Sequence, residues 1–361
     1  MSSQITAPKS LCILRLSAIG DVCHAVAMLQ QVQKQWPQIK ITWVIGKVEA
    51  NLLSGLSGVE FVIFDKKAGW QGYKNLWRQL RNRQFDILFH MQVALRASLV
   101  SLCIPAKIKL GFDRQRAKEG QWLFSNKKIM TQTNPHVLDG FMGFAQMLGV
   151  STTSIEKPSW QMPLTEQHQL WASEQLITKK PIAVISPAAS KTERNWLVER
   201  YAEIADHLAE RGFQVVICGG STVKEKELAA NIISLANTDI INLVAKTSLK
   251  QLLAVLKLAH LVIAPDTGPA HMAVTVSTPV IGLYAHSNPH RTGPYNYQHY
   301  VVSCYKQVIE QQHNKPLIDL PWGIRAKGGN LMANIEVEQV KDKIRQLIAD
   351  HYPELISTEE L

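Results

Sequence analysis

"LRLSAIGDVCHA", residues 14–25, ends an apolar run and begins a helical pattern. The apolar run, 11–16, predicts a buried strand, and apolar residues spaced three or four apart over 22–36 predict a helix. In nucleotide-binding folds, the turn between such a strand and helix offers glycines and backbone N–H groups to phosphate. This turn has a single glycine, Gly20, and the carboxylate of Asp21 follows it directly. The stretch therefore predicts an α/β fold in which this turn does not hold an anion.

Strand and helix patterns alternate along the whole chain, as is typical of parallel α/β sheets. The first half has strand patterns at 11–16, 41–45, 61–64, 87–91 and 109–111, and helical patterns at 22–36, 73–83 and 137–148. A polar stretch with two prolines, 150–167, interrupts the alternation and predicts a linker. The second half has strand patterns at 182–186, 214–218, 240–242, 261–264 and 280–284, and helical patterns at 197–211, 224–235, 249–258 and 270–276.

These patterns predict two Rossmann-like domains in tandem, since 361 residues are long for a single core. We expect the first over residues 1–157 and the second over 158–335. In the remaining segment, 336–361, an amphipathic helix from 337 to about 349 is expected to cross back onto the first domain. Ligands of parallel sheets bind beyond the carboxyl ends of the strands, which predicts an active site in a cleft between the halves. The long irregular segment after Tyr284, rich in histidine and aromatic residues, is expected to be functional.

Composition limits the compartment and the partners. The five cysteines are scattered and odd in number, which predicts free thiols in a reducing compartment. We find neither a signal-peptide pattern nor an apolar run of about 18 residues, so we expect a cytoplasmic protein. Residues 1–157 hold 20 Lys and Arg against 9 Asp and Glu, a net charge of +11, whereas residues 158–361 hold 19 against 20, a net charge of −1. The basic half either serves solubility or faces nucleic acid, a phosphorylated ligand or an acidic membrane surface.

The strongest local signal for an anion site is "LVIAPDTGPAHMAV", residues 261–274. A buried strand leads into the turn 266–268, and Pro269 is expected at the first helical position, where its missing N–H costs nothing. Asp266 or Thr267 can cap this helix while the other N–H groups of its first turn remain available to an anion. His271 lies in that turn and can donate to a phosphate. The alternative is a capped helix with a core histidine.

A second strand-to-helix turn, "ISPAASKTERNW" at 185–196, combines hydroxyls with cations. The residues concerned are Ser190, Lys191, Thr192 and Arg194. This combination suits a diphosphate, because an arginine can hold two oxygens at once. Glu225, which follows a third such turn, "CGGS" at 218–221, can accept hydrogen bonds from ribose hydroxyls. The alternatives are a solvated loop and an exposed glutamate.

Four of these motifs together resemble glycosyltransferase family nine, which contains the ADP-heptose:lipopolysaccharide heptosyltransferases. They are "SAIGD", "SPAASKTERNW", "GG…E" and "DTGPAH", which fits D-T-G-x-x-H. They occur in the family's order and extend over roughly residues 11–300. "GFDRQRAKEG" at 111–120 and "NPHVLDGF" at 134–141 further resemble the members that add the first heptose to the Kdo sugar of lipid A.

The resemblance implies a GT-B fold and an inverting, metal-independent transfer, with the donor on the C-terminal domain and the acceptor on the N-terminal one. Asp21 would be the general base, and Glu225 would hold the nucleoside. The diphosphate and sugar of the donor would be held by Ser190, Thr192, Arg194, Asp266, Thr267, Gly268 and His271. The acceptor would be held by Lys118, His136, Arg96 and Arg114. The chain departs from the family pattern in two places: Arg194 stands where lysine is usual, and the segment before Glu225 is longer.

The implied reaction moves L-glycero-D-manno-heptose from ADP-heptose to the Kdo residue of lipid A, with or without a phosphate on that Kdo. Such a transfer needs a base for the acceptor hydroxyl and a site that stabilises the departing diphosphate. Asp21 near a helix N-terminus suits the first role, because the helix dipole favours the carboxylate. We expect neither cofactor nor metal, since no Asp-x-Asp pair follows a strand. A membrane-embedded acceptor predicts peripheral association with the inner leaflet of the inner membrane.

Other functions remain as alternatives. A dinucleotide-dependent dehydrogenase lacks support, because the chain has no G-x-G-x-x-G and Asp21 stands where pyrophosphate needs donors. A nucleic-acid-binding protein would use the basic clusters at 66–67, 127–128 and 78–83, but the last is more simply a solvated helix face, and we expect no nucleic-acid partner. A catalytically inactive nucleotide-sugar-binding protein would not need Asp21. A family member with another sugar or acceptor, such as a second heptose or the outer core, shares all these motifs.

Overall fold

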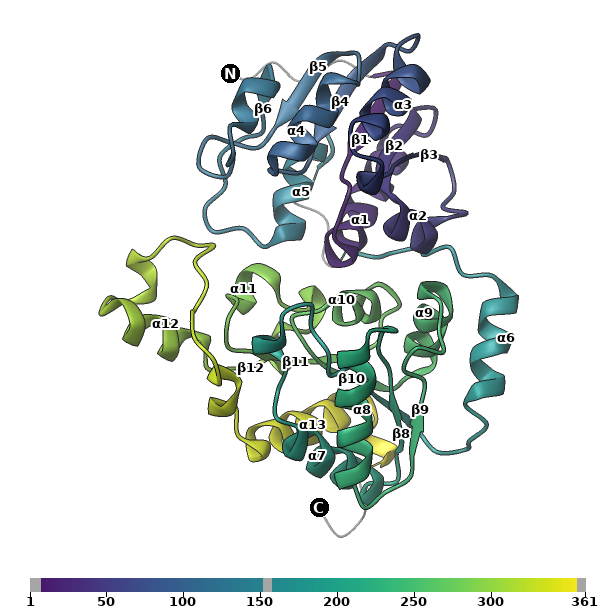
Figure 1. The fold of residues 1–361 in the computed structure, drawn as a ribbon, viewed down its shortest axis with the longest axis vertical. Helices are drawn as coiled ribbons and strands as arrows, with labels where there is room; N and C mark the ends of the chain where they lie inside the picture. The colour runs from purple at the N-terminus through teal and green to yellow at the C-terminus, as the bar shows by residue number, and fades with distance from the viewer. Residues whose placement is uncertain (1–7, 152–157, 356–361) are drawn as a thin grey trace. The chain divides into compact units, whose positions relative to one another are not determined.

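The computed structural model describes residues 8–151 and 158–355. The chain forms two compact units, Met1–Pro163 (unit 1) and Leu164–Leu361 (unit 2), each built around its own sheet (Figure 1). Three predicted features lie outside the described residues. They are the domain boundary at 157, the middle of the linker at 152–157, and the end of the C-terminal segment at 356–361.

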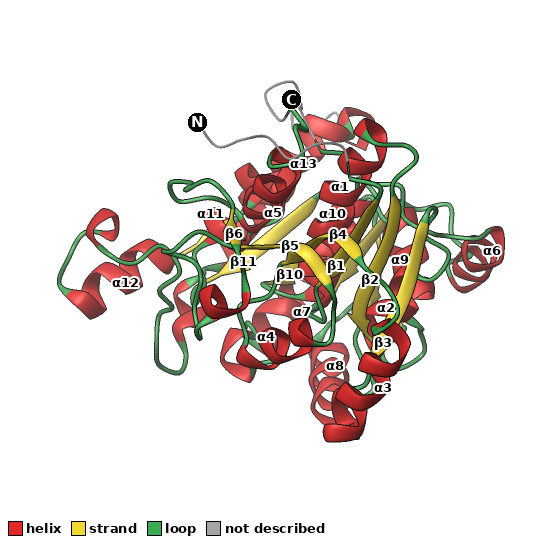
Figure 2. Cartoon of the chain, turned by 90° about the horizontal axis from the view of Figure 1, so that it is seen from above, coloured by secondary structure: helices red, strands yellow, loops and turns green. Residues whose placement is uncertain are grey.

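Unit 1 contains a six-stranded parallel sheet in the order β3-β2-β1-β4-β5-β6. Its strands are β1 (Ser10–Leu14), β2 (Lys40–Gly46), β3 (Val59–Phe64), β4 (Phe85–His90), β5 (Ala106–Gly111) and β6 (Lys127–Lys128). Its helices are α1 (Ile19–Gln35), α2 (Lys47–Leu53), η1 (Lys66–Ala68), α3 (Trp70–Leu80), α4 (Leu95–Leu102), η2 (Gln121–Phe124) and α5 (Val137–Gln146). Figure 2 shows α1 and α5 on one side of this sheet and α3 and α4 on the other. Helices on both faces explain why the central strands are almost continuously apolar.

Unit 2 contains a second six-stranded parallel sheet, in the order β12-β11-β10-β7-β8-β9. Its strands are β7 (Ile182–Ile185), β8 (Gln214–Ile217), β9 (Ile240–Asn242), β10 (Leu261–Pro265), β11 (Val280–Tyr284) and β12 (Val302–Ser303). Its α-helices are α6 (Glu166–Gln175), α7 (Val198–Glu210), α8 (Val223–Leu235), α9 (Leu249–Leu258), α10 (Gly268–Thr275), α11 (Pro289–Thr292), α12 (Tyr305–His313) and α13 (Val337–His351). Its 3-10 helices are η3 (Thr192–Arg194), η4 (Tyr295–Tyr300), η5 (Leu317–Asp319), η6 (Leu331–Asn334) and η7 (Pro353–Leu355). The predicted α/β class with two parallel sheets is confirmed.

The structure adds elements that the patterns did not predict. In unit 1 these are the short helices α2 and α4 and the edge strand β6, and in unit 2 they are α6, β12 and the helices of the segment after Tyr284. The two edge strands have two residues each, too few for an alternating pattern. The segment predicted as irregular contains α11, η4 and α12, and η4 packs against β11.

The last helix, α13, packs within unit 2, and its expected return to the first half stays a prediction. It contacts α7, β11 and β12. The chain that precedes it is tied to the same unit, because Trp196 Nε1 donates a hydrogen bond to the Ile335 carbonyl at 3.0 Å. The apolar stripe that predicts the helix, including Val340, Ile344 and Leu347, is fully buried.

A buried histidine at the end of β4 makes the stability of unit 1 depend on pH. His90 has no exposed surface, and neither of its ring nitrogens has a hydrogen-bond partner in the described part of the chain. Burial, and to a lesser extent the charge of Lys109, lowers the pKa of His90 from 6.5 to about 4. Between these values the unfolded chain binds a proton that the folded chain does not, so stability is lost as the pH falls from 6.5 toward 4.

We predict that His90→Met removes this loss. Between pH 7.5 and 5, His90 should lower the free energy of unfolding by about 2 kcal/mol, given 1.36 kcal/mol for each unit of pKa difference. Urea unfolding at the two pH values measures the difference for the native protein and the variant. His313→Met, at an exposed position on α12, is the control and should keep the native pH dependence. An equal pH dependence in the native protein and His90→Met would contradict the prediction.

Candidate functional site

Four neighbouring strands of unit 2 end at the same edge of its sheet, and each is followed by a residue with site chemistry. Arg194 follows β7, Glu225 follows β8, Asp266 follows β10, and Ser287 follows β11. These strands are adjacent in the sheet, in the order β11-β10-β7-β8. The carboxyl edge of a parallel sheet is where ligands of this fold class bind. The structure thus brings the turn of Arg194 and the turn of Asp266 together, as predicted.

Asp266 is the centre of this edge. Its side chain is 14% exposed, and its Oδ2 accepts a hydrogen bond from the Ser287 hydroxyl at 2.6 Å. His271 Nε2 lies 3.7 Å from Oδ1, and Arg194 Nη1 lies 3.5 Å from Oδ2. Burial would raise the pKa of Asp266, but His271, Ser287 and Arg194 outweigh it and keep this pKa below its usual value. The carboxylate therefore stays ionised and holds Arg194 and His271 at the edge of the sheet.

Helix α10 begins directly after this carboxylate, with one of the two predicted residues at the N-cap but without the predicted side-chain bond. Thr267 is the N-cap residue, yet its hydroxyl makes no capping hydrogen bond. Gly268 is the first helical residue and Pro269 the second, not the first as predicted. The Thr267 hydroxyl is buried and has no hydrogen-bond partner among the residues that the structure describes. A hydroxyl and the unpaired N–H groups of a first helical turn are suitable donors for a phosphate.

The loop after β7 presents its polar residues to solvent, apart from Arg194. Ser190 and Thr192 are exposed. The loop is braced by Asn195, whose Oδ1 accepts a hydrogen bond from the Ala189 N–H at 2.7 Å. Arg194 instead points back to the sheet edge, with its side chain 12% exposed. The predicted hydroxyl-and-cation cluster is thus divided into an exposed pair of hydroxyls and one inward arginine.

Glu225 forms a capping box at the start of α8. Its Oε2 accepts hydrogen bonds from the N–H and hydroxyl of Thr222, the latter at 2.6 Å, and its Oε1 accepts one from the Gly220 N–H at 2.9 Å. The predicted nucleoside ligand is therefore also a structural residue. A nucleoside contact would use lone pairs that these local donors leave free.

In unit 1, Asp21 is the third residue of α1 and is 29% exposed. Its Oδ2 accepts a hydrogen bond from the Ala18 N–H at 3.2 Å and forms an ion pair with Arg15. Both contacts use the same oxygen. Within residues 8–151 and 158–355, Oδ1 accepts no hydrogen bond, so one carboxylate oxygen is available to a substrate hydroxyl.

Arg15 is a site residue that the sequence prediction missed. It follows β1 and holds its guanidinium in place by three contacts: the ion pair with Asp21, a 2.6 Å hydrogen bond to the Met91 carbonyl, and the Phe141 ring 5.3 Å away. A cation on the ring face adds to the ion pair. The available signal was an arginine within the otherwise apolar run 11–16, six residues before the carboxylate.

The segment after β11 holds a second group of missed residues. Ser287 donates to Asp266, and its neighbours His286 and Asn288 are buried. Their side-chain nitrogens, Nε2 and Nδ2, have no hydrogen-bond partner in the part of the chain that the structure describes. The sequence predicts that the segment after Tyr284 is functional, but its composition does not single out these three residues.

Three of the predicted acceptor ligands are exposed cations on neighbouring segments of unit 1. Arg96 lies in the first turn of α4, and Arg114 and Lys118 lie in the loop after β5. A hydrogen bond from the Leu95 N–H to Glu119 Oε2, 2.7 Å long, ties this loop to the start of α4. The structure therefore brings the segments of these three cations together.

The fourth, His136, is buried and caps α5. Its Nδ1 accepts a hydrogen bond from the Leu138 N–H at 3.1 Å. Its ring packs edge-on against that of His24, with 5.1 Å between the centroids. His24 lies one turn after Asp21 on α1, so the α5 cap contacts the helix of the carboxylate. A role of His136 in acceptor binding stays a prediction.

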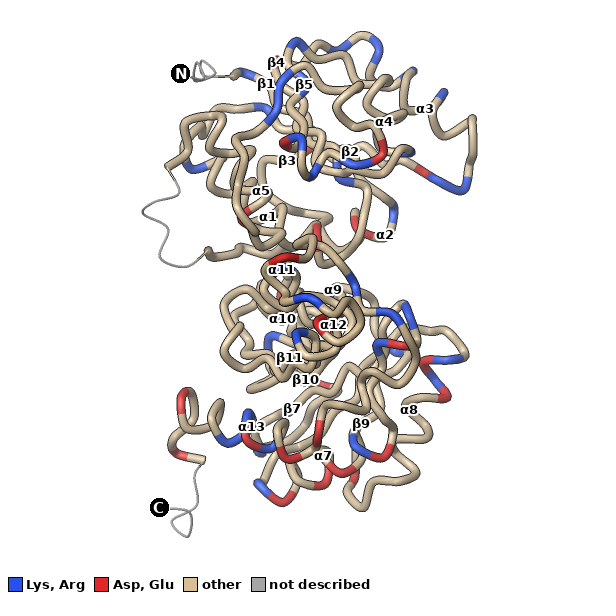
Figure 3. Tube along the Cα trace, turned by 90° about the vertical axis from the view of Figure 1, so that its left-hand side faces the viewer, with Lys and Arg blue, Asp and Glu red and all other residues tan. Residues whose placement is uncertain are grey.

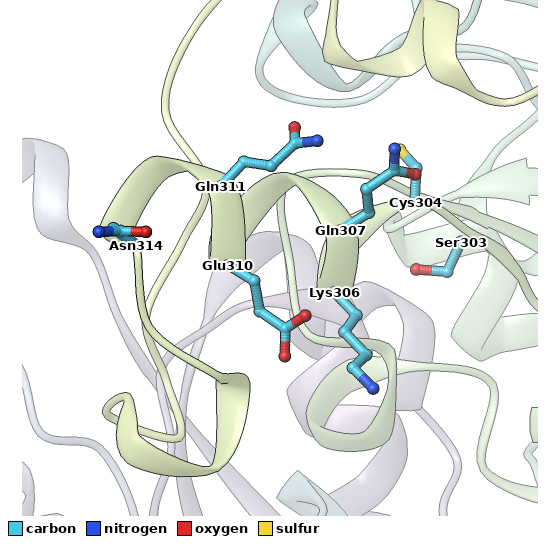
Figure 4. A pocket seen from close by; sticks show the side chains of 7 residues that line it. All are labelled: Ser303, Cys304, Lys306, Gln307, Glu310, Gln311 and Asn314. Carbon is cyan, nitrogen blue, oxygen red and sulfur yellow. The ribbon is translucent and has the colours of Figure 1, made fainter.

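Residues 8–151 and 158–355 contain no group of three or more His, Cys, Asp or Glu side chains arranged to hold a metal ion. An open pocket of about 570 Å³ lies along α12 (Figure 4), lined by Ser303, Cys304, Lys306, Gln307, Glu310, Gln311 and Asn314. None of these residues belongs to the predicted donor or acceptor sets. Glu310 is engaged locally, because its Oε1 accepts a hydrogen bond from the Leu317 N–H at 2.8 Å.

Comparison with known proteins identifies similar chains. The model of glycosyltransferase family 9 (heptosyltransferase) matches residues 73–318. The lipopolysaccharide core heptosyltransferase OpsX of Haemophilus influenzae is 46% identical over 341 residues, 94% of this chain and 97% of that protein.

Solved structures are similar over nearly the whole chain. The glycosyl transferase family 9 structure from Veillonella parvula has a TM-score of 0.78 and 22% identity, over 95% of this chain and 97% of that one. The E. coli heptosyltransferase WaaC, solved with ADP, has a TM-score of 0.72 and 22% identity, over 94% and 99% of the two chains. At these identities the likeness establishes the fold.

Proposed function

Because this chain belongs to glycosyltransferase family 9, we propose that it transfers L-glycero-D-manno-heptose from ADP-heptose to the Kdo residue of lipid A, with inversion. The observation that carries the proposal is that each unit places polar groups at the carboxyl edge of its own sheet. In unit 1 this is the Asp21 carboxylate, of which one oxygen accepts no hydrogen bond from the described residues. In unit 2 these are the groups around Asp266 that can donate hydrogen bonds to a phosphate. The H. influenzae relative, a lipopolysaccharide core heptosyltransferase, supports the pathway.

In this proposal unit 2 binds the donor. Arg194, the Thr267 hydroxyl and the first N–H groups of α10 hold the diphosphate, while Asp266 orients Arg194 and His271. These groups stabilise the charge that develops on ADP as the bond to the heptose breaks, a task that a metal ion performs in other transferases. The exposed hydroxyls of Ser190 and Thr192 and the backbone at Gly268 complete the donor set.

Unit 1 binds the acceptor and removes its proton. Oδ1 of Asp21 accepts the proton of the Kdo hydroxyl as its oxygen bonds to the anomeric carbon of the heptose. ADP leaves from the opposite side, so the configuration at that carbon inverts. Arg15 keeps Oδ2 occupied and directs the other oxygen to the hydroxyl. Arg96, Arg114 and Lys118 bind the phosphates and carboxylate of the acceptor, with His136 at the cap of α5.

The proposed reaction is tested by incubating the protein with ADP-heptose and Kdo-lipid A, with and without a phosphate on Kdo, followed by mass spectrometry of the lipid. A mass gain of one heptose on either acceptor supports the proposal. A third incubation uses Kdo-lipid A that already carries one heptose, and a gain on this acceptor alone would assign the second-heptose step instead. Binding of ADP-heptose without transfer to any acceptor would assign a nucleotide-sugar-binding protein.

The structural role of Glu225 and its proposed role in binding the ADP-heptose donor can be tested separately. The single oxygen of glutamine can keep the Thr222 contacts of the capping box, whereas its amide nitrogen cannot accept from the Gly220 N–H, so Glu225→Gln should lower the thermal midpoint of unfolding only slightly. If the carboxylate also accepts from the ribose hydroxyls, the variant should bind ADP about tenfold more weakly, because hydrogen bonds to charged acceptors are stronger. Calorimetric titration with ADP measures this. Native ADP affinity in Glu225→Gln would restrict the residue to helix capping.

We further propose that the protein acts in the cytoplasm, at the inner leaflet where a lipid-anchored acceptor is accessible. The part of the chain that the structure describes has no helix with the length and apolarity of a membrane span. The excess of basic residues in the first half suits a peripheral contact with acidic lipids.

A further inference from the structure

Helix α3 presents an unusual solvent-facing stripe. Trp70, Lys74, Trp77 and Arg81 follow one another at helical spacing, and all four are exposed. The two tryptophans are 84% and 46% exposed, although tryptophan is among the most buried side chains on average. The guanidinium of Arg81 lies 5.1 Å from the centre of the Trp77 ring. The stripe therefore alternates aromatic and cationic groups on the side of α3 that faces away from the sheet.

The neighbouring segments expose apolar side chains as well. On α4, Leu95, Leu99 and Leu102 form an exposed stripe opposite the buried residues of that helix. On η2, Trp122 and Leu123 are 63% and 67% exposed. Burying a leucine or tryptophan is favourable, so a stripe of them on a surface marks a site of contact.

These segments lie on one face of unit 1. Leu76 of α3 and Val100 of α4 pack into the same core cluster, on the same side of the sheet. The two helices also touch, because Cys103 Sγ lies 3.7 Å from the Tyr73 carbonyl oxygen. Helix η2 contacts α4, and Figure 2 shows α3 and α4 on the same side of the sheet. We define the α3/α4 face by its exposed apolar residues: Trp70, Trp77, Leu95, Leu99, Leu102, Trp122 and Leu123.

The charges around this face are mostly positive. Neither α3 nor α4 contains an acidic residue, whereas η1, α3 and the C-cap residue of α3 carry five cations. These are Lys66, Lys67, Lys74, Arg78 and Arg81. Figure 3 shows that Lys and Arg predominate along unit 1. The two nearby acids are engaged with backbone N–H groups, Asp65 with that of Lys67 and Glu119 with that of Leu95.

We propose that the α3/α4 face docks unit 1 on an anionic lipid bilayer, with the tryptophans and leucines at the headgroup level and the cations on the lipid phosphates. Tryptophan, leucine, lysine and arginine on one helical face are typical of segments that lie in a membrane interface. Each lysine or arginine near an acidic membrane adds about 1 kcal/mol of attraction. A symmetric contact with a second copy would instead place these cations against one another.

This membrane contact rests on the proposed function in one respect: a lipid acceptor explains why the protein would bind a membrane. It is tested without any acceptor, by co-sedimentation with vesicles of phosphatidylcholine alone or with about 30% phosphatidylglycerol. The native protein should bind the acidic vesicles at low salt, show a blue shift of tryptophan fluorescence, and be released at about 0.5 M salt. Failure to bind acidic vesicles, or equal binding to both kinds, would overturn the proposal.

Two double variants separate the apolar and the charged contributions. Trp70→Ser with Trp77→Ser should weaken partitioning onto acidic vesicles about tenfold or more, because two interfacial side chains are lost. Lys74→Glu with Arg81→Glu should reduce binding at least as much and abolish the preference for acidic lipid. The control pair, Leu170→Ser with Ile177→Ser, removes exposed apolar residues of unit 2 and should bind as the native protein does. The assignment of this face would be contradicted if the control pair lost vesicle binding equally. It would also be contradicted if neither α3 variant lost any.

The outcome can be separated from that of the heptose-transfer proposal. Both α3 variants should bind ADP with native affinity and transfer heptose to a deacylated, water-soluble acceptor at the native rate. Loss of transfer to the soluble acceptor would show that α3 belongs to the acceptor site and not to a membrane contact. Vesicle binding in a protein that transfers no heptose would support the docking face and contradict the proposed function.

Discussion

Asp21→Asn is expected to lower the turnover of heptose transfer about 1000-fold, within the range that a positioned general base contributes. Asparagine has the shape of aspartate and can still accept a hydrogen bond from the Ala18 N–H, so the turn should keep its conformation. It cannot take the proton of the acceptor hydroxyl. ADP binds to unit 2 in the proposed function, so ADP affinity should be unchanged. Turnover, calorimetric titration with ADP, and thermal unfolding measure the three quantities.

The matched control is Asp86→Asn, at the amino end of β4. Asp86 has the same kinds of contact as Asp21, a backbone N–H and a cation: the Lys9 N–H at 2.9 Å and the Lys107 ammonium at 2.7 Å. It lies at the opposite edge of the sheet, so Asp86→Asn can reduce stability but should leave turnover unchanged. Near-native turnover in Asp21→Asn would refute the assignment of Asp21 as the general base. An equal loss of turnover in both variants would show that the loss comes from a damaged fold.

Arg194→Ala is expected to weaken the binding of ADP about 30-fold or more. The variant removes a bidentate donor for the diphosphate and also leaves the buried Asp266 carboxylate without its cation. Asp266 would then repel the incoming phosphates. Arg194→Lys should retain most of the affinity, since lysine keeps the charge and is the usual residue at this position in the family that the motifs resemble.

Calorimetric titration with ADP distinguishes these outcomes. Arg345→Ala serves as the control, because Arg345 forms an Arg–Asp ion pair with Asp342 on the exposed side of α13 and is not part of the proposed donor site. Its ADP affinity should be native. Unchanged affinity in Arg194→Ala would remove this residue from the donor site and leave the α10 turn as the remaining anion-binding element.

The alternation of apolar strands and helices was sufficient to predict two parallel sheets, because strands covered on both faces are continuously apolar. It also placed Arg194 and Asp266 at one edge, since the carboxyl ends of parallel strands meet there. It did not predict α4, whose inward face combines an alanine and a valine with two serines and therefore lacks an apolar stripe. For the same reason the exposed leucines of that helix could not be paired with the tryptophans of α3.

The sequence by itself determined the residue types that carry the proposed chemistry: Asp21 after a strand, Arg194 in a second turn, and Asp266 before a helix. Only the tertiary structure decided what surrounds them. Arg15 occupies one oxygen of Asp21, Ser287 and His271 hold Asp266, and Thr222 engages Glu225. The physical reason is that a charged group's function depends on its neighbours within about 4–6 Å. Arg15 and Ser287 come from positions that the local spacing of residues did not connect with the carboxylates, whereas His271 and Thr222 lie in the same motifs as Asp266 and Glu225.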